Sequence, residues 1–477
     1  MKKEKRDIIL FFISKLITGI AGFFIITLYS ALLSPEQYGE YSLISGFVSA
    51  LISVFIGWIG SSALRYYIDY EDNKKTFFTN VLYYVLSMIV MMSIIIVIVS
   101  FISKTIPISN YLVATIFFTI AFSFYDVFEK VFRAAQKTVI YSIALILQSI
   151  LNVALFFVFA KFLNMKTISI FSSVSISRTV FVVIAILSLY VLKNISVQPF
   201  DKAMFKKFLK YGLPMIGVWG VGWILSYCDR YIIAIFYNTS DVGIYDISYK
   251  MAENSINVFV STFTLAIFPM LITAWKKNGK EDVENKIKEV LRYFFILILP
   301  AVMGLICISD KLYHLGILNS KYQSGRNIII FICIGMFFNG LNSIFNKLWQ
   351  LNEKTKNILY VMIASVIINI ALNLIFVPKF GITIAAITTL ISYIFSVIIT
   401  YCLVRKEIKI KFDFKSLVKS IFATIIMSAF VISFNNKVDS IKMLFLEIFL
   451  AVIVYGIITL ITKNVTIKEF KKGNDNE

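Results

Sequence analysis

Four basic side chains lie inside long apolar stretches of this chain, where a lipid environment disfavours charge: Lys15, Arg178, Arg230 and Lys250. A charged side chain at the centre of a membrane helix costs about 3 kcal/mol on insertion scales, and such groups usually face a protein interior or a water-filled path. Arg and Lys compensate the charge of phosphate groups, and Arg adds a planar pair of donors. These residues therefore predict a binding site for an anionic, phosphate-bearing substrate. Because binding needs no covalent chemistry, we predict a protein that is not an enzyme.

Three acidic residues accompany these cations. Asp229 precedes Arg230, and Asp246, Lys250 and Glu253 share one helix face at spacings of four and three residues. A purely structural interpretation is that these residues form salt bridges, with Arg230 paired to its neighbour Asp229 and Lys250 paired to Glu253. We predict that Asp229, Asp246 and Glu253 act in coupling or charge pairing.

Lys15 and several stripes of polar residues also have structural explanations. Lys15 lies near the start of its apolar stretch and can extend its ammonium to the membrane surface. Polar residues form stripes at helical spacing, which either line a cavity or hold helices together by interhelical hydrogen bonds. The stripes are Ser42, Ser45, Ser49 and Ser53; Asn339, Asn342, Asn346 and Gln350; and Ser365, Asn369 and Asn373.

The composition requires a membrane environment for the helices that carry these residues. The chain has 477 residues, 59% of them hydrophobic, and a formal net charge of +20. No soluble protein of this length can cover so much apolar surface, so we predict a polytopic, all-α membrane protein. The single His and four unpaired Cys predict no metal site, and neither a cofactor nor a nucleic-acid partner is expected.

Apolar runs of about 20 residues span a bilayer. The first run is too long for a signal peptide and has no small-residue cleavage site, so we take it as a transmembrane helix. The loops are short, and no phosphate-binding G-x-x-x-x-G-K motif occurs. Fourteen spans are predicted at 8–33, 38–63, 77–103, 111–132, 140–163, 168–192, 209–237, 243–274, 289–309, 326–350, 357–377, 382–404, 417–434 and 440–462.

The distribution of basic residues predicts the orientation of these spans. Of the 47 Lys and Arg residues, 32 lie on the same side as the N-terminus, nine on the opposite side, and six within or beside spans. Cytoplasmic loops of membrane proteins are enriched in Lys and Arg. We therefore predict a multi-pass protein of the plasma (inner) membrane with both termini in the cytoplasm.

The sequence also repeats itself. Residues 34–41, Ser-Pro-Glu-Gln-Tyr-Gly-Glu-Tyr, match residues 238–245, Asn-Thr-Ser-Asp-Val-Gly-Ile-Tyr, and Asn152 matches Asn369 in a similar context. Six predicted spans separate the copies, which predicts a parallel repeat of two six-helix bundles. The predicted domains are an N-terminal bundle at 1–192, a C-terminal bundle at 193–404, and two additional helices with a cytoplasmic tail at 405–477.

Several motifs resemble those of one family. Residues 211–214 (Tyr-Gly-Leu-Pro), 229–233 (Asp-Arg-Tyr-Ile-Ile), 242–245 (Val-Gly-Ile-Tyr) and 250–252 (Lys-Met-Ala) are similar to the seventh-to-eighth helix signature of Wzx-type polysaccharide flippases. These belong to the multidrug/oligosaccharidyl-lipid/polysaccharide exporter superfamily. The first loop and the Pro-Lys-Phe-Gly element at 378–381 match as well, and the resemblance covers nearly the whole chain. One departure is Thr383-Ile384, where the family commonly has a Gly.

The resemblance implies a flippase for an undecaprenyl-diphosphate-linked oligosaccharide of surface polysaccharide biosynthesis, such as O-antigen or exopolysaccharide. It implies alternating access through a cationic cavity between the bundles, with membrane lipids, a polymerase and glycosyltransferases as partners. Coupling to an ion gradient or to the membrane potential stays open. The alternative is a cation-coupled multidrug-type exporter of the same fold, although such a transporter would favour carboxylates in its cavity. A membrane glycosyltransferase would need a large outer loop, which the chain lacks.

Overall fold

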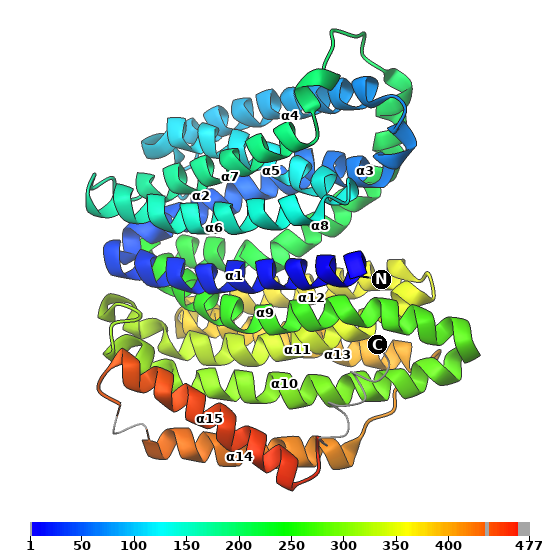
Figure 1. The fold of residues 1–477 in the computed structure, drawn as a ribbon. Coiled ribbons are helices and arrows are strands. Elements are labelled where there is room, and N and C mark those ends of the chain that lie inside the picture. The colour runs from blue at the N-terminus through cyan, green and yellow to red at the C-terminus, as the bar shows by residue number, and fades with distance from the viewer. Residues whose placement is uncertain (1, 435–437, 466–477) are drawn as a thin grey trace. The chain divides into compact units, whose positions relative to one another are not determined.

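The computed structural model describes residues 2–434 and 438–465, apart from the side chains of 2–9, 12, 262, 265 and 266. Every regular element in this described part is helical (Figure 1), which confirms the all-α prediction. The predicted tail lies largely outside it. The α-helices are α1 Lys2–Leu32, α2 Pro35–Leu51, α3 Gly57–Tyr66, α4 Lys74–Ile102, α5 Leu112–Ala134, α6 Thr138–Lys161, α7 Ile168–Ser188, α8 Lys202–Phe236, α9 Thr239–Asn278, α10 Lys280–His314, α11 Arg326–Leu351, α12 Thr355–Phe380, α13 Thr383–Val404, α14 Phe414–Phe434 and α15 Ile441–Ile461.

The predicted membrane spans correspond to these helices. In the described part, thirteen helical stretches are long and apolar enough to cross a membrane, with α2 and α3 forming one of them through a π-helical turn at Ile52–Ile56. The extra residue of a π turn widens the helix locally. The remaining predicted span, 243–274, lies within α9, whose first turns carry several charged side chains.

Three helices extend well beyond their predicted apolar runs. α8, α9 and α10 contain 35, 40 and 35 residues. At 1.5 Å per residue, 35 residues reach about 52 Å, compared with about 30 Å of hydrocarbon core. The additional turns of α10 carry the segment 280–288, in which six of the nine residues are charged. A helix satisfies its own backbone hydrogen bonds, so it continues beyond the apolar run into water.

The described residues fall into two compact units, each built by helix-on-helix packing. The first unit comprises Met1–Ile247 and Ile370–Ile382, and the second comprises Ser248–Asn369 and Thr383–Glu477. In the first, α6 packs on α1 and α7, while α5 packs on α3, α4 and α7 and α8 packs on α3. In the second, α11 packs on α13 and α10, and α14 packs on α10 and α15. The division into packing units does not test whether the helices repeat along the chain, so the parallel repeat of two six-helix bundles stays a prediction.

The two copies of the short repeat meet inside the first unit. A capping box begins α2: Ser34 Oγ accepts from Gln37 N at 3.3 Å, and Gln37 Oε1 accepts from Ser34 N at 3.1 Å. Asn238 Oδ1 caps α9 in the equivalent way by accepting from Asp241 N at 2.9 Å. Such caps satisfy backbone donors that the first turn of a helix leaves unpaired. The motif therefore starts a helix in both copies.

The contact between the copies is reciprocal and depends on glycine. A Cβ on Gly39 would overlap the carbonyl oxygen of Thr239, and a Cβ on Gly243 would overlap that of Pro35. Thr239 and Pro35 are themselves equivalent in the repeat, as are the two glycines. A contact in which each side uses the same residues is what a local twofold axis produces. The two helix starts thus touch backbone to backbone, which only Gly allows.

Candidate functional site

A buried cluster of charged and polar side chains joins α8 to α9 in the first unit. Arg230 and Asp246 are 1% and 4% exposed. Arg230 donates to Asp246 Oδ1 from Nε at 2.9 Å and from Nη2 at 2.6 Å, and its Nη1 donates to the Ser226 carbonyl oxygen. All three guanidinium nitrogens are therefore engaged within the protein. Removing one member of a buried ion pair costs about 3–5 kcal/mol, so this pair holds the two helices together.

Asp229 occupies the same cluster and links it to α12. Tyr245 donates its hydroxyl to Asp229 Oδ2 at 2.6 Å, and Asn373 Nδ2 donates to Asp229 Oδ1 at 2.7 Å. The three residues are buried. These two hydrogen bonds connect the Asp229 carboxylate on α8 to α9 and α12. The sequence analysis did not connect Tyr245 or Asn373 with Asp229, although each lies in a motif or stripe that it singled out.

Arg178 presents a different environment on α7. Its guanidinium carbon lies 3.8 Å from the ring centroid of Phe122, 5.2 Å from that of Tyr125 and 5.7 Å from that of Phe118, all on α5. Aromatic faces attract a cation, but they accept few of its hydrogen bonds. Nε and Nη1 are buried, and no described residue accepts a hydrogen bond from either. Arg178 is thus a half-buried cation whose buried Nε and Nη1 have no acceptor among the described residues, the arrangement that a phosphate oxygen would complete.

The other two predicted cations are less buried. Lys15 is exposed, with Nζ 5.6 Å from the Phe11 ring centroid, which agrees with a side chain that extends to the membrane surface. Lys250 Nζ lies 2.6 Å from Glu253 Oε2, and these side chains are 27% and 25% exposed. The pairing of Lys250 with Glu253 that the spacing allowed is therefore present. Partly exposed ion pairs hold little energy, so Lys250 can exchange this partner at small cost.

Members of the two Asn stripes join helices in the second unit. Asn342 Nδ2 donates to Ser396 Oγ at 2.9 Å between α11 and α13, and Asn369 Nδ2 donates to Thr389 Oγ1 at 3.3 Å between α12 and α13. Interhelical hydrogen bonds of this kind average about 0.6 kcal/mol in a membrane protein. Of the two interpretations left open for the Asn stripes, the structure shows interhelical contacts at these positions.

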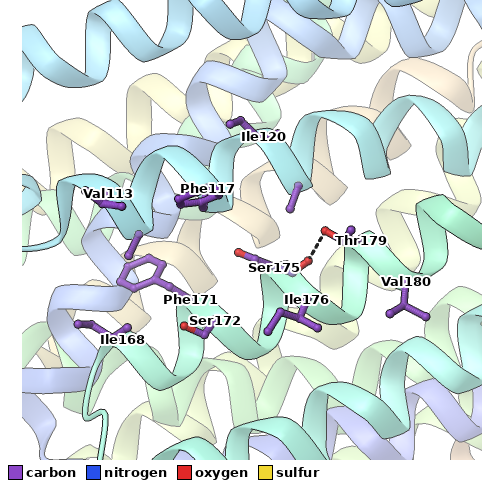
Figure 2. Close-up of a pocket in the computed structure, with 12 residues that line it drawn as sticks. Val113, Phe117, Ile120, Ile168, Phe171, Ser172, Ser175, Ile176, Thr179 and Val180 are labelled. Atoms are coloured by element: carbon purple, nitrogen blue, oxygen red, sulfur yellow. Dashed lines mark hydrogen bonds between the residues drawn. The ribbon is translucent and has the colours of Figure 1, made fainter.

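A large groove in the first unit has none of the predicted charged site residues in its lining. It has a volume of about 570 Å³ and runs between α5 and α7, where Val113, Phe117 and Ile176 line it (Figure 2). Thr179 Oγ1 donates to the Ser175 carbonyl oxygen within it at 2.8 Å, and no charged residue lines it. Arg178 lies on the same helix but is not part of the lining. An apolar groove of this type suits a lipid chain rather than a charged headgroup.

Comparison with known proteins places the chain in a family. Residues 5–275 match the sequence profile described as polysaccharide biosynthesis protein. The chain belongs to the polysaccharide biosynthesis protein family. This confirms the resemblance on which the sequence analysis relied.

Two relatives of this polysaccharide biosynthesis protein match about half of its length. The probable low-salt glycan biosynthesis flippase Agl15 of Haloferax volcanii is 24% identical over 252 residues, which cover 52% of this chain and 53% of the relative. The uncharacterized membrane protein MJ1068 of Methanocaldococcus jannaschii is 26% identical over 261 residues, which cover 54% of this chain and 50% of the relative. The chain therefore spans about half the length of the curated relatives that it matches.

Solved structures share the fold over most of the chain. The lipid II flippase MurJ in an inward closed conformation superposes with a TM-score of 0.75 at 17% identity and covers 94% of this chain and 98% of its own. An inward-facing multidrug resistance MATE family transporter of the MOP superfamily superposes with a TM-score of 0.68 at 14% identity, covering 82% of this chain and 94% of its own. At this identity the likeness establishes the fold, and the substrate must be argued from the site.

Proposed function

We propose that this protein is a flippase that moves an undecaprenyl-diphosphate-linked oligosaccharide from the cytoplasmic to the outer leaflet. The observation that carries the proposal is Arg178, whose buried Nε and Nη1 have no described acceptor. Buried donor atoms without acceptors are costly unless a ligand completes their hydrogen bonds. A diphosphate headgroup supplies both charge and acceptors, and a protein of the polysaccharide biosynthesis family encounters such headgroups on its lipid-linked sugars.

In this proposal the predicted site residues have different roles in a cationic cavity that opens alternately to the two sides of the membrane. Arg178 meets the diphosphate directly, and the accessible ammonium groups of Lys15 and Lys250 add charge. Arg230 keeps α8 and α9 in register through Asp246. Asp229, Asp246 and Glu253 balance or couple the charges, and the membrane lipids and the polymerase and glycosyltransferases of the pathway are the partners.

The alternative is a cation-coupled multidrug-type exporter, which the shared fold of the MATE transporter favours. The two activities differ in the charge of the substrate, so one assay separates them. In proteoliposomes, the protein is expected to make a labelled undecaprenyl-diphosphate oligosaccharide accessible to a membrane-impermeant quencher well above protein-free vesicles. A lipophilic cationic dye loaded in the same vesicles is expected to stay inside. Dye export without movement of the labelled lipid would replace the flippase proposal with the exporter.

The protein is a multi-pass membrane protein, and we extend the proposal to its orientation in the plasma membrane. The 32 basic residues on the side of the N-terminus predict that both termini are cytoplasmic and that the turn at 238–243 is outside. Reporter fusions at residue 477 and at the turn should therefore show opposite accessibility. A cytoplasmic reporter at 238–243 would reverse the direction assigned to transport while leaving the fold unchanged.

A further inference from the structure

A buried carboxylate in the second unit lacks the donors it needs. Glu447 lies on α15 and is 0% exposed, and neither of its carboxylate oxygens has a hydrogen-bond partner among the described residues. Lys311, on the last turn of α10 and 7% exposed, places Nζ 3.7 Å from Glu447 Oε2. That distance compensates charge but exceeds that of a hydrogen bond. Lys311 therefore compensates the charge of Glu447, but no described residue donates a hydrogen bond to the carboxylate.

Glu447 lines a cavity of about 490 Å³ between α9, α10, α14 and α15. Apolar side chains make up most of the wall, including Phe259, Leu305 and Met427. Tyr455, also in the wall, donates its hydroxyl to the Ile296 carbonyl oxygen at 2.7 Å. Glu447 and Tyr455 are eight residues apart on α15, or about 12 Å along the helix. The cavity thus extends as an apolar channel from Glu447, which has no hydrogen-bond donor among the described residues, to Tyr455, whose hydroxyl already donates to Ile296.

We infer that this cavity binds a single-chain amphiphile whose end group is a hydroxyl. The hydroxyl would donate to Glu447, and the hydrocarbon chain would run along α15 toward Tyr455. A neutral donor suits the site because Lys311 already compensates the carboxylate charge. The mostly apolar wall of the cavity suits a hydrocarbon chain. The inference concerns the second unit alone and does not depend on the proposed flippase activity.

A matched pair of probes tests the hydroxyl. The purified full chain is exposed to a photoactivatable ten-carbon alcohol or to its methyl ether, which keeps the chain and removes the donor. Crosslinks are then mapped by mass spectrometry. A hydrogen bond to a charged acceptor predicts that the alcohol half-saturates labelling of the cavity helices α9, α10, α14 and α15 at about ten-fold lower concentration than the ether. Equal half-saturation would overturn the inference, as would labelling outside these helices, because a protonated Glu447 or a plain apolar groove gives no preference.

One variant tests the cavity without replacing Glu447. A Cβ on Gly304 would meet only Met427 Cε, at 3.9 Å, so Gly304→Leu fills the cavity without a backbone clash. Both probes should then lose labelling. Gly456→Leu on α15 is the matched control, because a Cβ there meets nothing within 4 Å and Gly456 is not part of the lining. Unchanged labelling in Gly304→Leu contradicts the inference.

A second variant tests the role of the charged pair. In Lys311→Met with Glu447→Leu, which removes both charges together, the alcohol and the ether should label equally.

Discussion

Replacing Arg178 by alanine is expected to lower the rate of lipid-linked oligosaccharide translocation by ~10- to 100-fold, since a hydrogen bond to a charged group contributes about 1.5–3 kcal/mol. The protein should still reach the membrane at normal level. Its thermal stability should stay the same or rise, because no described residue accepts a hydrogen bond from Nε or Nη1 of Arg178 that the variant would lose. Arg178→Lys should keep part of the activity, since the charge remains while the planar fork is lost. Translocation and melting temperature are measured on the same preparations.

The combination of lost transport and kept stability is what separates a substrate contact from a structural role. Arg133→Ala is the matched control, because Arg133 lies on α5 of the same unit and makes a half-exposed ion pair with Glu129 at 3.1 Å. Such a pair contributes at most about 1 kcal/mol, so this variant should transport normally. If Arg178→Ala transports normally, or if its melting temperature falls along with its transport, Arg178 is a structural residue and the proposed contact with the diphosphate is wrong.

Replacing Gly39 or Gly243 by alanine is expected to prevent accumulation of folded protein. Each added methyl would overlap a backbone carbonyl oxygen of the opposite helix start, and a backbone cannot turn aside as a long side chain can. Overpacking a close contact typically costs 1–3 kcal/mol and occasionally more, which is a large share of the stability of a domain. Folded protein is measured as the monodisperse fraction after detergent extraction.

The contact is reciprocal, so the effects of the two substitutions can be compared directly. Because Gly39 faces Thr239 and Gly243 faces Pro35, the two single variants should be impaired to a similar degree. Gly217→Ala and Gly220→Ala, on α8 of the same unit, serve as controls because a Cβ at either site meets nothing within 4 Å. Folded yields equal to those of the controls would show that the two helix starts do not pack as closely as described.

The sequence by itself determined the features that depend on local chemistry. Apolar runs of about 20 residues predict membrane helices because lipid leaves the backbone no other hydrogen-bond partners. The predicted break between the spans 8–33 and 38–63 is present, since α1 ends at Leu32 and α2 begins at Pro35. The cost of charge in lipid was enough to single out Arg178 and Arg230. Each of these inferences uses residues within a few turns of one another.

Only the tertiary structure decided which of the singled-out residues meet. Asp229 receives a hydrogen bond from Asn373, which lies 144 residues away, and Arg230 is held by Asp246 on the next helix. The sequence also provided no role for Glu447, whose partner Lys311 lies on α10. Contacts such as these depend on how helices rotate and pack against each other, and helical periodicity defines the faces of one helix but not which neighbour covers them. Packing is therefore what leaves Nε and Nη1 of Arg178 without acceptors among the described residues while it satisfies Arg230.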